Sequence, residues 1–161
     1  MNEITLKPIG VIHTPFKEPK GAPIQPARSN GTEGTIELYP EYIDGLKDLD
    51  GFSHITLIYY FHLSLGYKLE VIPFLDTERR GLFATRAPKR PNPLGLSTVE
   101  LLNIENNILY IKNVDMVDGT PLLDIKPFVP EFDSHTDIKT GWLKDRAGES
   151  EKTKADNRFE G

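Results

Sequence analysis

The segment from residue 79 to residue 95, RRGLFATRAPKRPNPLG, combines cations and prolines in a spacing that suits anion binding. It holds five of the 19 Lys and Arg residues, and Pro88, Pro91 and Pro93 stand within six positions. Each proline fixes its own φ and restricts the residue before it, so this cationic segment is stiff. Cations held at set positions bind phosphate or carboxylate with less entropy lost on binding. A solvated basic loop with turn prolines explains the same composition equally well.

A second segment, residues 118 to 127 with the sequence DGTPLLDIKP, predicts a tight turn followed by a short strand. Asp-Gly followed by Thr-Pro forces the chain to turn. The backbone N–H and C=O groups that such a turn exposes suit an adenine edge or an ammonium group. A plain hairpin turn is the simpler interpretation of these residues.

The histidines do not predict a metal site. His54 and His62 share one side of a predicted strand, but eight residues at ~3.3 Å each place them ~26 Å apart. His62 stands at the end of that strand, where it either lines a pocket or packs as a capping residue. Residues 133–137 have ligand-like types but lie in a polar stretch that predicts a surface loop. G-x-S-x-G, P-loop and G-x-G-x-x-G motifs are absent, so neither a hydrolase elbow nor a Rossmann nucleotide site is supported.

The composition limits the possible environments and partners. The 161 residues carry a net charge of −5 and no cysteine, which excludes disulfides, a thiol nucleophile and thiolate metal ligands. Together with the lack of a signal peptide and of any apolar run near 18 residues, this predicts a cytoplasmic protein without a membrane segment. The acidic balance counts against a surface that is basic throughout, but it leaves room for a local basic patch.

The elements that must position these residues are mainly strands. Alternating or β-branched runs separated by turn signals predict strands over residues 7–14, 34–38, 55–61, 69–74, 81–86, 96–104, 108–114 and 122–125. Only one short helix is expected, at residues 40–46, and residues 16–31 read as a long loop. The prediction is a mainly β, single-domain barrel or sandwich over residues 1–143 with one or two short helices. Residues 144–161 form a charged tail by composition, with Phe159 as its one apolar anchor.

Five ordered blocks carry a resemblance to a known family. They are Pro8–Phe16 (PIGVIHTPF), Gly34–Leu38 (GTIEL), Leu49–Ile55 (LDGFSHI), Phe83–Ser97 (FATRAPKRPNPLGLS) and Asp118–Pro127 (DGTPLLDIKP). In this order, over residues 7 to about 130, the chain resembles the TsaA-like family, also called the TrmO family. The resemblance implies a single β-barrel that forms a homodimer and binds S-adenosylmethionine near the subunit interface. It also implies methylation of N6 of threonylcarbamoyladenosine, next to the anticodon of tRNA.

The same resemblance assigns roles to particular residues. Cofactor contacts carried over by motif are Pro23, Ile24, Gln25, His62, Leu63, Arg86, Leu96, Asp118, Gly119, Thr120 and Pro121. Contacts to the tRNA anticodon loop fall on Lys89 and Arg90. Arg86 would pair with the cofactor carboxylate, and Asp118 or the carbonyls of its turn would take the ammonium or the ribose hydroxyls. Asp118 and His62 are the candidates if a general base takes part.

Two alternatives to tRNA methylation stay open. Characterised bacterial members carry an additional C-terminal domain, whereas this chain ends soon after the matching blocks, so tRNA would be held by the dimer or by the cationic segment. That difference and the charge of −5 also fit methylation of a small molecule or a protein. The lack of a self-evident catalytic pair fits a non-catalytic barrel that binds a nucleotide-like ligand.

Overall fold

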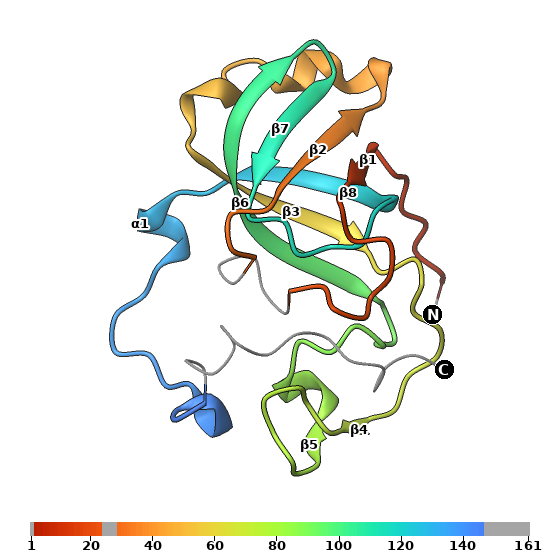
Figure 1. Ribbon diagram of the computed structural model, residues 1–161, viewed down its shortest axis with the longest axis vertical. Coiled ribbons are helices and arrows are strands. Elements are labelled where there is room, and N and C mark those ends of the chain that lie inside the picture. Colours follow the sequence, from red (N-terminus) through yellow and green to blue (C-terminus); the bar gives the residue numbers. More distant parts are fainter. Residues whose placement is uncertain (1, 24–28, 147–161) are drawn as a thin grey trace.

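Six antiparallel strands close into a barrel in the order β1-β2-β7-β6-β3-β8 (Figure 1). The computed structural model describes residues 2–23 and 29–146. The barrel strands are β1 (Gly10–His13), β2 (Glu33–Leu38), β3 (His54–Tyr60), β6 (Leu94–Glu105), β7 (Ile108–Lys112) and β8 (Thr120–Pro127). The predicted mainly β barrel is therefore confirmed.

The barrel interior is filled by the alternate residues of each strand. In β3, Ile55, Leu57 and Tyr59 are buried while the residues between them face outward. Successive side chains of a strand point to opposite faces, so every second apolar residue reaches the same core. The buried cluster comprises Ile12, Ile36, Leu38, Ile55, Leu57, Tyr59, Val99, Leu109, Ile111, Val114, Met116 and Leu122.

Two irregularities bend the strands around this core. The pairing of β6 with β7 shifts between Leu101 and Asn103, and the pairing of β3 with β8 shifts between Ile58 and Tyr59. An extra residue on one strand increases local twist, which helps a sheet to close on itself. The twelve-residue β6 can therefore pair with β3 through its first half and with β7 through its second half.

The antiparallel order places three connections at one end of the barrel. The connections after β1 (residues 14–32), after β3 (residues 61–93) and after β7 (residues 113–119) all leave from this end, which we call the mouth. The opposite end carries the 3-10 helices η2 (Pro40–Leu46) and η3 (Leu49–Gly51) and the tight turn between β6 and β7. The residues to which the family resemblance assigns cofactor or tRNA contacts belong to the mouth connections or to the strand ends beside them.

The connection after β3 forms a small lobe below the barrel in Figure 1. It contains the two-stranded sheet of β4 (Glu70–Val71) and β5 (Arg80–Gly81), followed by the 3-10 helix η4 (Leu82–Ala84). After β8, the chain continues through α1 (Pro130–Asp133) to the 3-10 helix η5 (Gly141–Leu143). None of the helices within residues 2–23 and 29–146 combines the length and apolarity that a bilayer crossing requires.

Several local predictions need correction. The strand expected at residues 81–86 is wrong, because β5 ends at Gly81 and residues 82–84 form η4. The strand expected at residues 69–74 is reduced to the two residues of β4. The short helix at residues 40–46 is present as a 3-10 helix that begins at Pro40. In the charged tail, residues 144–146 are described, whereas residues 147–161, including Phe159, lie outside the described part.

Candidate functional site

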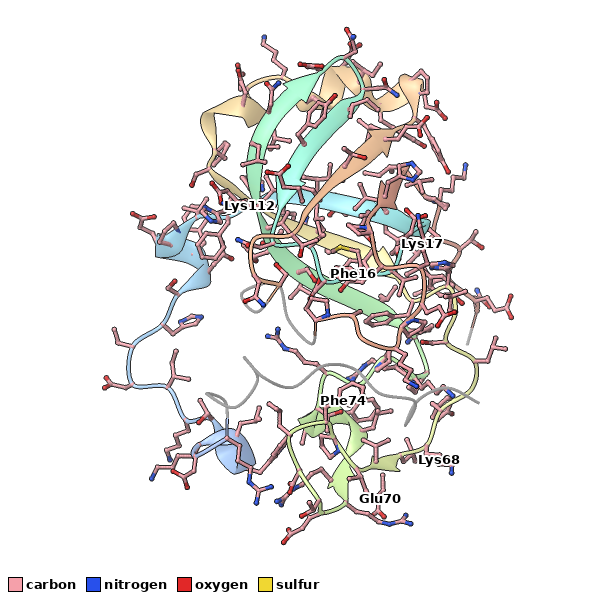
Figure 2. The ribbon with its side chains drawn as sticks, viewed as in Figure 1. Phe16, Lys17, Lys68, Glu70, Phe74 and Lys112 are labelled. Atoms are coloured by element: carbon pink, nitrogen blue, oxygen red, sulfur yellow. The ribbon has the colours of Figure 1, made fainter. Side chains whose placement is uncertain are left out.

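Asp118 joins the first and third connections at the mouth. Its Oδ1 accepts a hydrogen bond from Thr14 N at 3.0 Å, and its Oδ2 accepts one from Lys17 Nζ at 2.7 Å. The Asp118 amide donates in return to Phe16 O at 2.7 Å. Figure 2 shows Phe16 and Lys17 at the barrel edge that faces the small lobe. The hydrogen bond from Lys17 is the main cause that lowers the pKa of Asp118. Burial opposes this shift, but the hydrogen bond from Thr14 and the charges of Lys17 and His13 also lower the pKa. Asp118 therefore stays ionised and anchors the first loop.

The turn after Asp118 is packed against the second connection. Gly119 has a φ of +79°, which glycine adopts without the strain of a side chain. The N–H of Gly119 donates to Ile12 O and that of Thr120 to Val117 O, so the donors of the turn are used within the protein. What the turn can offer a ligand is therefore carbonyl oxygens, which suit ammonium, amino or hydroxyl groups.

His62 lies directly beside this turn. A Cβ built on Gly119 would stand 4.0 Å from His62 Nε2, so the two residues are neighbours although 57 positions separate them. Burial lowers the pKa of the His62 imidazole, which keeps the ring neutral near pH 7. A neutral imidazole has one acceptor nitrogen. The mouth thus combines a hydrogen-bond acceptor with a glycine that leaves space for a ligand.

A chain of buried hydroxyls leads from the barrel wall to Asp115. The Tyr59 and Ser97 hydroxyls are 2.8 Å apart, and Ser97 Oγ donates to Asp115 Oδ1 at 2.7 Å. Because Ser97 gives its proton to Asp115, the Tyr59 hydroxyl is the donor to Ser97. Gly95 makes room for this arrangement, since a Cβ there would stand 2.1 Å from Tyr59 Cε2. Gly95 and Ser97 at the start of β6 are thereby explained by their contacts with Tyr59.

Asp115 is the carboxyl group at the mouth whose pKa is raised. Burial raises the pKa of its carboxyl to about 7, against the opposing effects of the Ser97 hydrogen bond and of Arg86. Arg86 also acts on the hydroxyl of Tyr59, whose pKa is held far above its usual value by burial and by Asp115. Arg86 therefore lies within electrostatic reach of the hydroxyl chain.

Arg90 organises the cationic segment from inside. Its Nη1 donates to Thr85 O at 3.0 Å, Ala87 O at 3.3 Å and Leu82 O at 3.4 Å. Its guanidinium carbon also lies 5.7 Å from the centre of the Phe83 ring. These contacts shape the backbone around Arg86, so Arg90 has a structural role in addition to any contact with an anion.

Apolar side chains surround the mouth and are exposed. Leu63 and Leu96, both predicted cofactor contacts, are 53% and 54% exposed. Other exposed apolar side chains of the second connection and adjacent strand ends are Tyr60, Leu65, Tyr67, Leu69, Ile72, Phe83 and Leu94. Six of these nine side chains belong to the second connection, which makes it a candidate surface for a ligand or partner.

The structure brings most of the predicted site residues to one place. His62, Arg86, and the 118–121 turn all belong to the mouth, and Leu63 and Leu96 flank it. Pro23 is half-buried in the first connection, whereas Ile24 and Gln25 lie outside the described residues. Lys89 and Arg90 lie on the cationic segment of the same connection as Arg86. Within residues 2–23 and 29–146, no group of three or more His, Asp or Glu side chains could hold a metal ion.

The sequence reasoning missed Tyr59, Ser97 and Asp115. A signal for Asp115 was present, because it stands between Val114 and Met116, which are 0% and 3% exposed. A carboxylate between two core residues is rarely placed there unless it is hydrogen-bonded. Composition alone does not distinguish Asp115 from the exposed charged residues.

The donor set fits a nucleoside that carries an amino-acid chain. Arg86 supplies a cation for a carboxylate, the 119–121 turn supplies carbonyl acceptors, and Leu63 and Leu96 supply apolar surface for a base. The neutral His62 and the half-buried Asp115 add acceptors that can face positive charge. This combination of groups matches the chemistry of S-adenosylmethionine.

Fold and site together define a class: closed antiparallel β-barrels whose ligand site is built from three loops at one end. More particularly, residues 11–134 match the family model described as the tRNA-methyltransferase O N-terminal domain. This match covers well over half of the chain, so the protein belongs to the TrmO family, and the resemblance inferred from the sequence is confirmed.

Named relatives share this family. A Pyrococcus abyssi protein named as a probable S-adenosyl-L-methionine-binding protein is 53% identical over 156 residues, which are 97% of this chain and 85% of that protein. The Escherichia coli tRNA (adenine(37)-N6)-methyltransferase is 36% identical over 154 residues, covering 89% of this chain and 66% of the enzyme. A crystal structure of TrmO from Pseudomonas aeruginosa superposes with a TM-score of 0.74 at 36% identity, covering 88% and 63% of the two chains. The chain thus spans somewhat less than two thirds of these two bacterial relatives.

Proposed function

We propose that the protein is an S-adenosylmethionine-dependent methyltransferase that acts on N6 of threonylcarbamoyladenosine next to the tRNA anticodon. The observation that carries the proposal is the convergence of His62, Arg86 and the Asp118–Pro121 turn at one barrel mouth. Relatives named as S-adenosylmethionine-binding proteins and as tRNA (adenine(37)-N6)-methyltransferases support the cofactor and the acceptor.

In the proposed complex, Arg86 pairs with the cofactor carboxylate and the carbonyls of the turn accept from the ammonium or the ribose. Leu63 and Leu96 cover the base. When bound, S-adenosylmethionine supplies an electrophilic methyl group, and Asp115 places negative charge near that cationic ligand. Positioning and exclusion of water provide much of the rate of such a displacement.

His62 is the better suited of the two predicted proton acceptors. Asp118 is held by Thr14 and Lys17 and has a lowered pKa, so it accepts a proton poorly. His62 is neutral near pH 7 and stands at the mouth beside Gly119. It can take the proton that the N6 nitrogen loses, or hydrogen-bond to the N6–H and orient it.

We assign the tRNA contacts to Lys89 and Arg90 and the exposed apolar surface around Leu63 and Leu65 to a homodimer interface. The cations lie on the same connection as Arg86, so phosphates bound there would bring a nucleotide to the mouth. Since the protein is acidic overall, this local patch must provide most of the phosphate attraction. Light scattering tests the dimer: a monomeric mass at micromolar concentration would contradict it.

The central experiment measures transfer of labelled methyl groups to tRNA that lacks the N6-methyl mark. Label in the RNA supports the proposal, whereas label in a metabolite fraction alone would favour the small-molecule alternative that the net charge of −5 suggests. Arg86→Ala should weaken cofactor binding by roughly 1.5–3 kcal/mol in calorimetry, as expected for a charged hydrogen bond. The matched control is Arg79→Ala, which removes an exposed arginine of the same segment outside the mouth. Equal affinities of the two variants would remove Arg86 from the site.

A further inference from the structure

The chain beyond the barrel returns to the small lobe after an exposed tether. Residues 134–140 are exposed throughout, and the following residues 141–146, which we call the strap, contact the lobe. Trp142 and Leu143 of the strap are half-buried. Trp142 Nε1 donates to Ala84 O at 2.8 Å, and the Arg80 guanidinium carbon lies 5.5 Å from the Trp142 ring centre. The strap thus contacts the cationic segment, although Trp142 and Ala84 are 58 residues apart in the sequence.

A buried carboxylate fixes both parts of this contact. Asp76 is 5% exposed, and it accepts hydrogen bonds from its neighbours Thr77 N at 2.7 Å and Glu78 N at 3.2 Å. It also accepts from Arg80 Nε at 2.6 Å and from Arg146 Nη1 of the strap. Burial by itself would raise the pKa of Asp76, but these hydrogen bonds outweigh it and the pKa is lowered. Asp76 therefore stays charged near neutral pH and links the lobe to the strap.

The contacts of the strap end close to Arg86. Ala84, whose carbonyl accepts from Trp142, stands two residues before Arg86. The carbonyls of Thr85 and Ala87, on either side of Arg86, accept from Arg90. The backbone around Arg86 is therefore fixed by Arg90 from within the segment and by the strap from outside it. Removing the strap contact would free the backbone between the end of η4 at Ala84 and Arg86.

We propose that Trp142 and Arg146 are positioning residues that hold the backbone of Arg86 in its binding position at the mouth. This rests on the proposed function, in which Arg86 binds the cofactor carboxylate. The strap lies beyond residues 11–134, which match the family model, so that match assigns it no role. Arg80 and Asp76 connect the strap to the lobe in this arrangement.

Trp142 is the only tryptophan of the chain, so its fluorescence reports directly on strap docking. In Arg146→Gln, the strap loses its ion pair with Asp76, and the emission maximum should shift to the red as Trp142 becomes exposed. The Kd for S-adenosylmethionine should rise about fivefold to tenfold, comparable to the loss of one hydrogen bond to a charged group. Lys144→Gln is the matched control: it removes the same charge from an exposed position of the strap and should leave both values unchanged. Arg146→Lys keeps the charge and should restore most of the affinity.

The outcomes separate this proposal from the proposed function. If wild type does not bind S-adenosylmethionine in calorimetry, the proposed function fails and the role of the strap fails with it. If wild type binds and Arg146→Gln shifts the emission without changing Kd, only the positioning role is overturned. An unshifted emission in Arg146→Gln overturns it as well, because the strap then docks without Arg146. A merely destabilised protein would show fewer binding sites at an unchanged Kd, whereas loss of positioning raises Kd at full stoichiometry.

Discussion

The barrel wall and the connection over residues 61–93 are held together in different ways. The wall is a closed ladder around fully buried aliphatic side chains such as Leu57 and Ile111. The connection has few buried apolar residues and is shaped by Asp76, Arg90 and its prolines. The stability of the fold thus resides mainly in the wall, whereas the connection carries the proposed cofactor contacts His62, Leu63 and Arg86. Substitutions should separate the two properties accordingly.

The largest effect on stability is expected in the wall. Leu57→Ala should lower the free energy of unfolding by roughly 3 kcal/mol, because it removes a fully buried side chain and leaves a cavity. Leu65→Ala, in the connection, should change it by less than about 0.5 kcal/mol, because Leu65 is 81% exposed. Urea denaturation measures both values. Similar losses in the two variants would contradict the division between wall and connection.

Gly95 tests the place where wall and site meet. Gly95→Ala should cost about 2 kcal/mol or more, since its Cβ would overlap the buried Tyr59 ring and force that ring or the strand to move. Displacement of Tyr59 should also break its hydrogen bond to Ser97 and weaken cofactor binding. Gly45→Ala is the control, because nothing lies within 4 Å of a Cβ at that position. Denaturation curves that coincide for the two alanine variants would refute the packing argument.

Asp115 gives a pH dependence of known sign. Its pKa is about 7 in the folded protein and 3.8 in its ordinary state, so the unfolded chain loses this proton first as pH rises. The stability that protonated Asp115 contributes is complete below about pH 4 and is lost as pH rises through 7. Asp115→Asn should remove the loss of stability that occurs as wild-type Asp115 ionises. Its free energy of unfolding should exceed that of wild type by at least ~1 kcal/mol between pH 4.5 and pH 8. Parallel profiles of stability against pH in urea titrations would show that Asp115 is not perturbed.

The smallest effect is expected for the exposed ion pair at the mouth. Lys17→Gln should lower the free energy of unfolding by less than about 0.5 kcal/mol, because Lys17 is 71% exposed and solvent screens the pair. It should nevertheless speed amide exchange at Phe16 and its neighbours, since the Asp118 carboxylate then retains only its hydrogen bond from Thr14 N to this loop. Unchanged exchange there would show that the hydrogen bonds of Asp118 with Thr14 and Phe16 order the loop without Lys17.

The same contrast explains what the sequence could predict. The wall follows from local composition: the β-branched and aromatic residues of 55–61 predict the strand that forms β3. Asn106, with its φ of 53°, forms the turn between the strands expected at residues 96–104 and 108–114. In the connection, residues 81–86 predict a strand, whereas residues 82–84 form η4. A run of three or four apolar residues does not distinguish a strand from a helix, because it is too short to show either the two-residue period of a strand or the 3.6-residue period of a helix.

The site was predictable where its residues are contiguous and not where it depends on distant partners. The cationic segment and the 118–121 turn stand out as local sequence. The partners of Trp142 and Arg146 are 58 and 70 residues away, so no local pattern reveals the strap. The hydroxyl chain from Tyr59 to Asp115 likewise requires three separate elements to be brought together.

The two ends of the connection meet in the barrel wall. Tyr60 and Leu94 are paired across β3 and β6, and Phe61 N donates to Pro93 O at 2.8 Å. Residues 61–93 therefore begin and end at a single residue pair of the β3–β6 ladder, as a hairpin loop does. A connection anchored in this way can change in sequence without altering the strand pairing of the barrel beneath it.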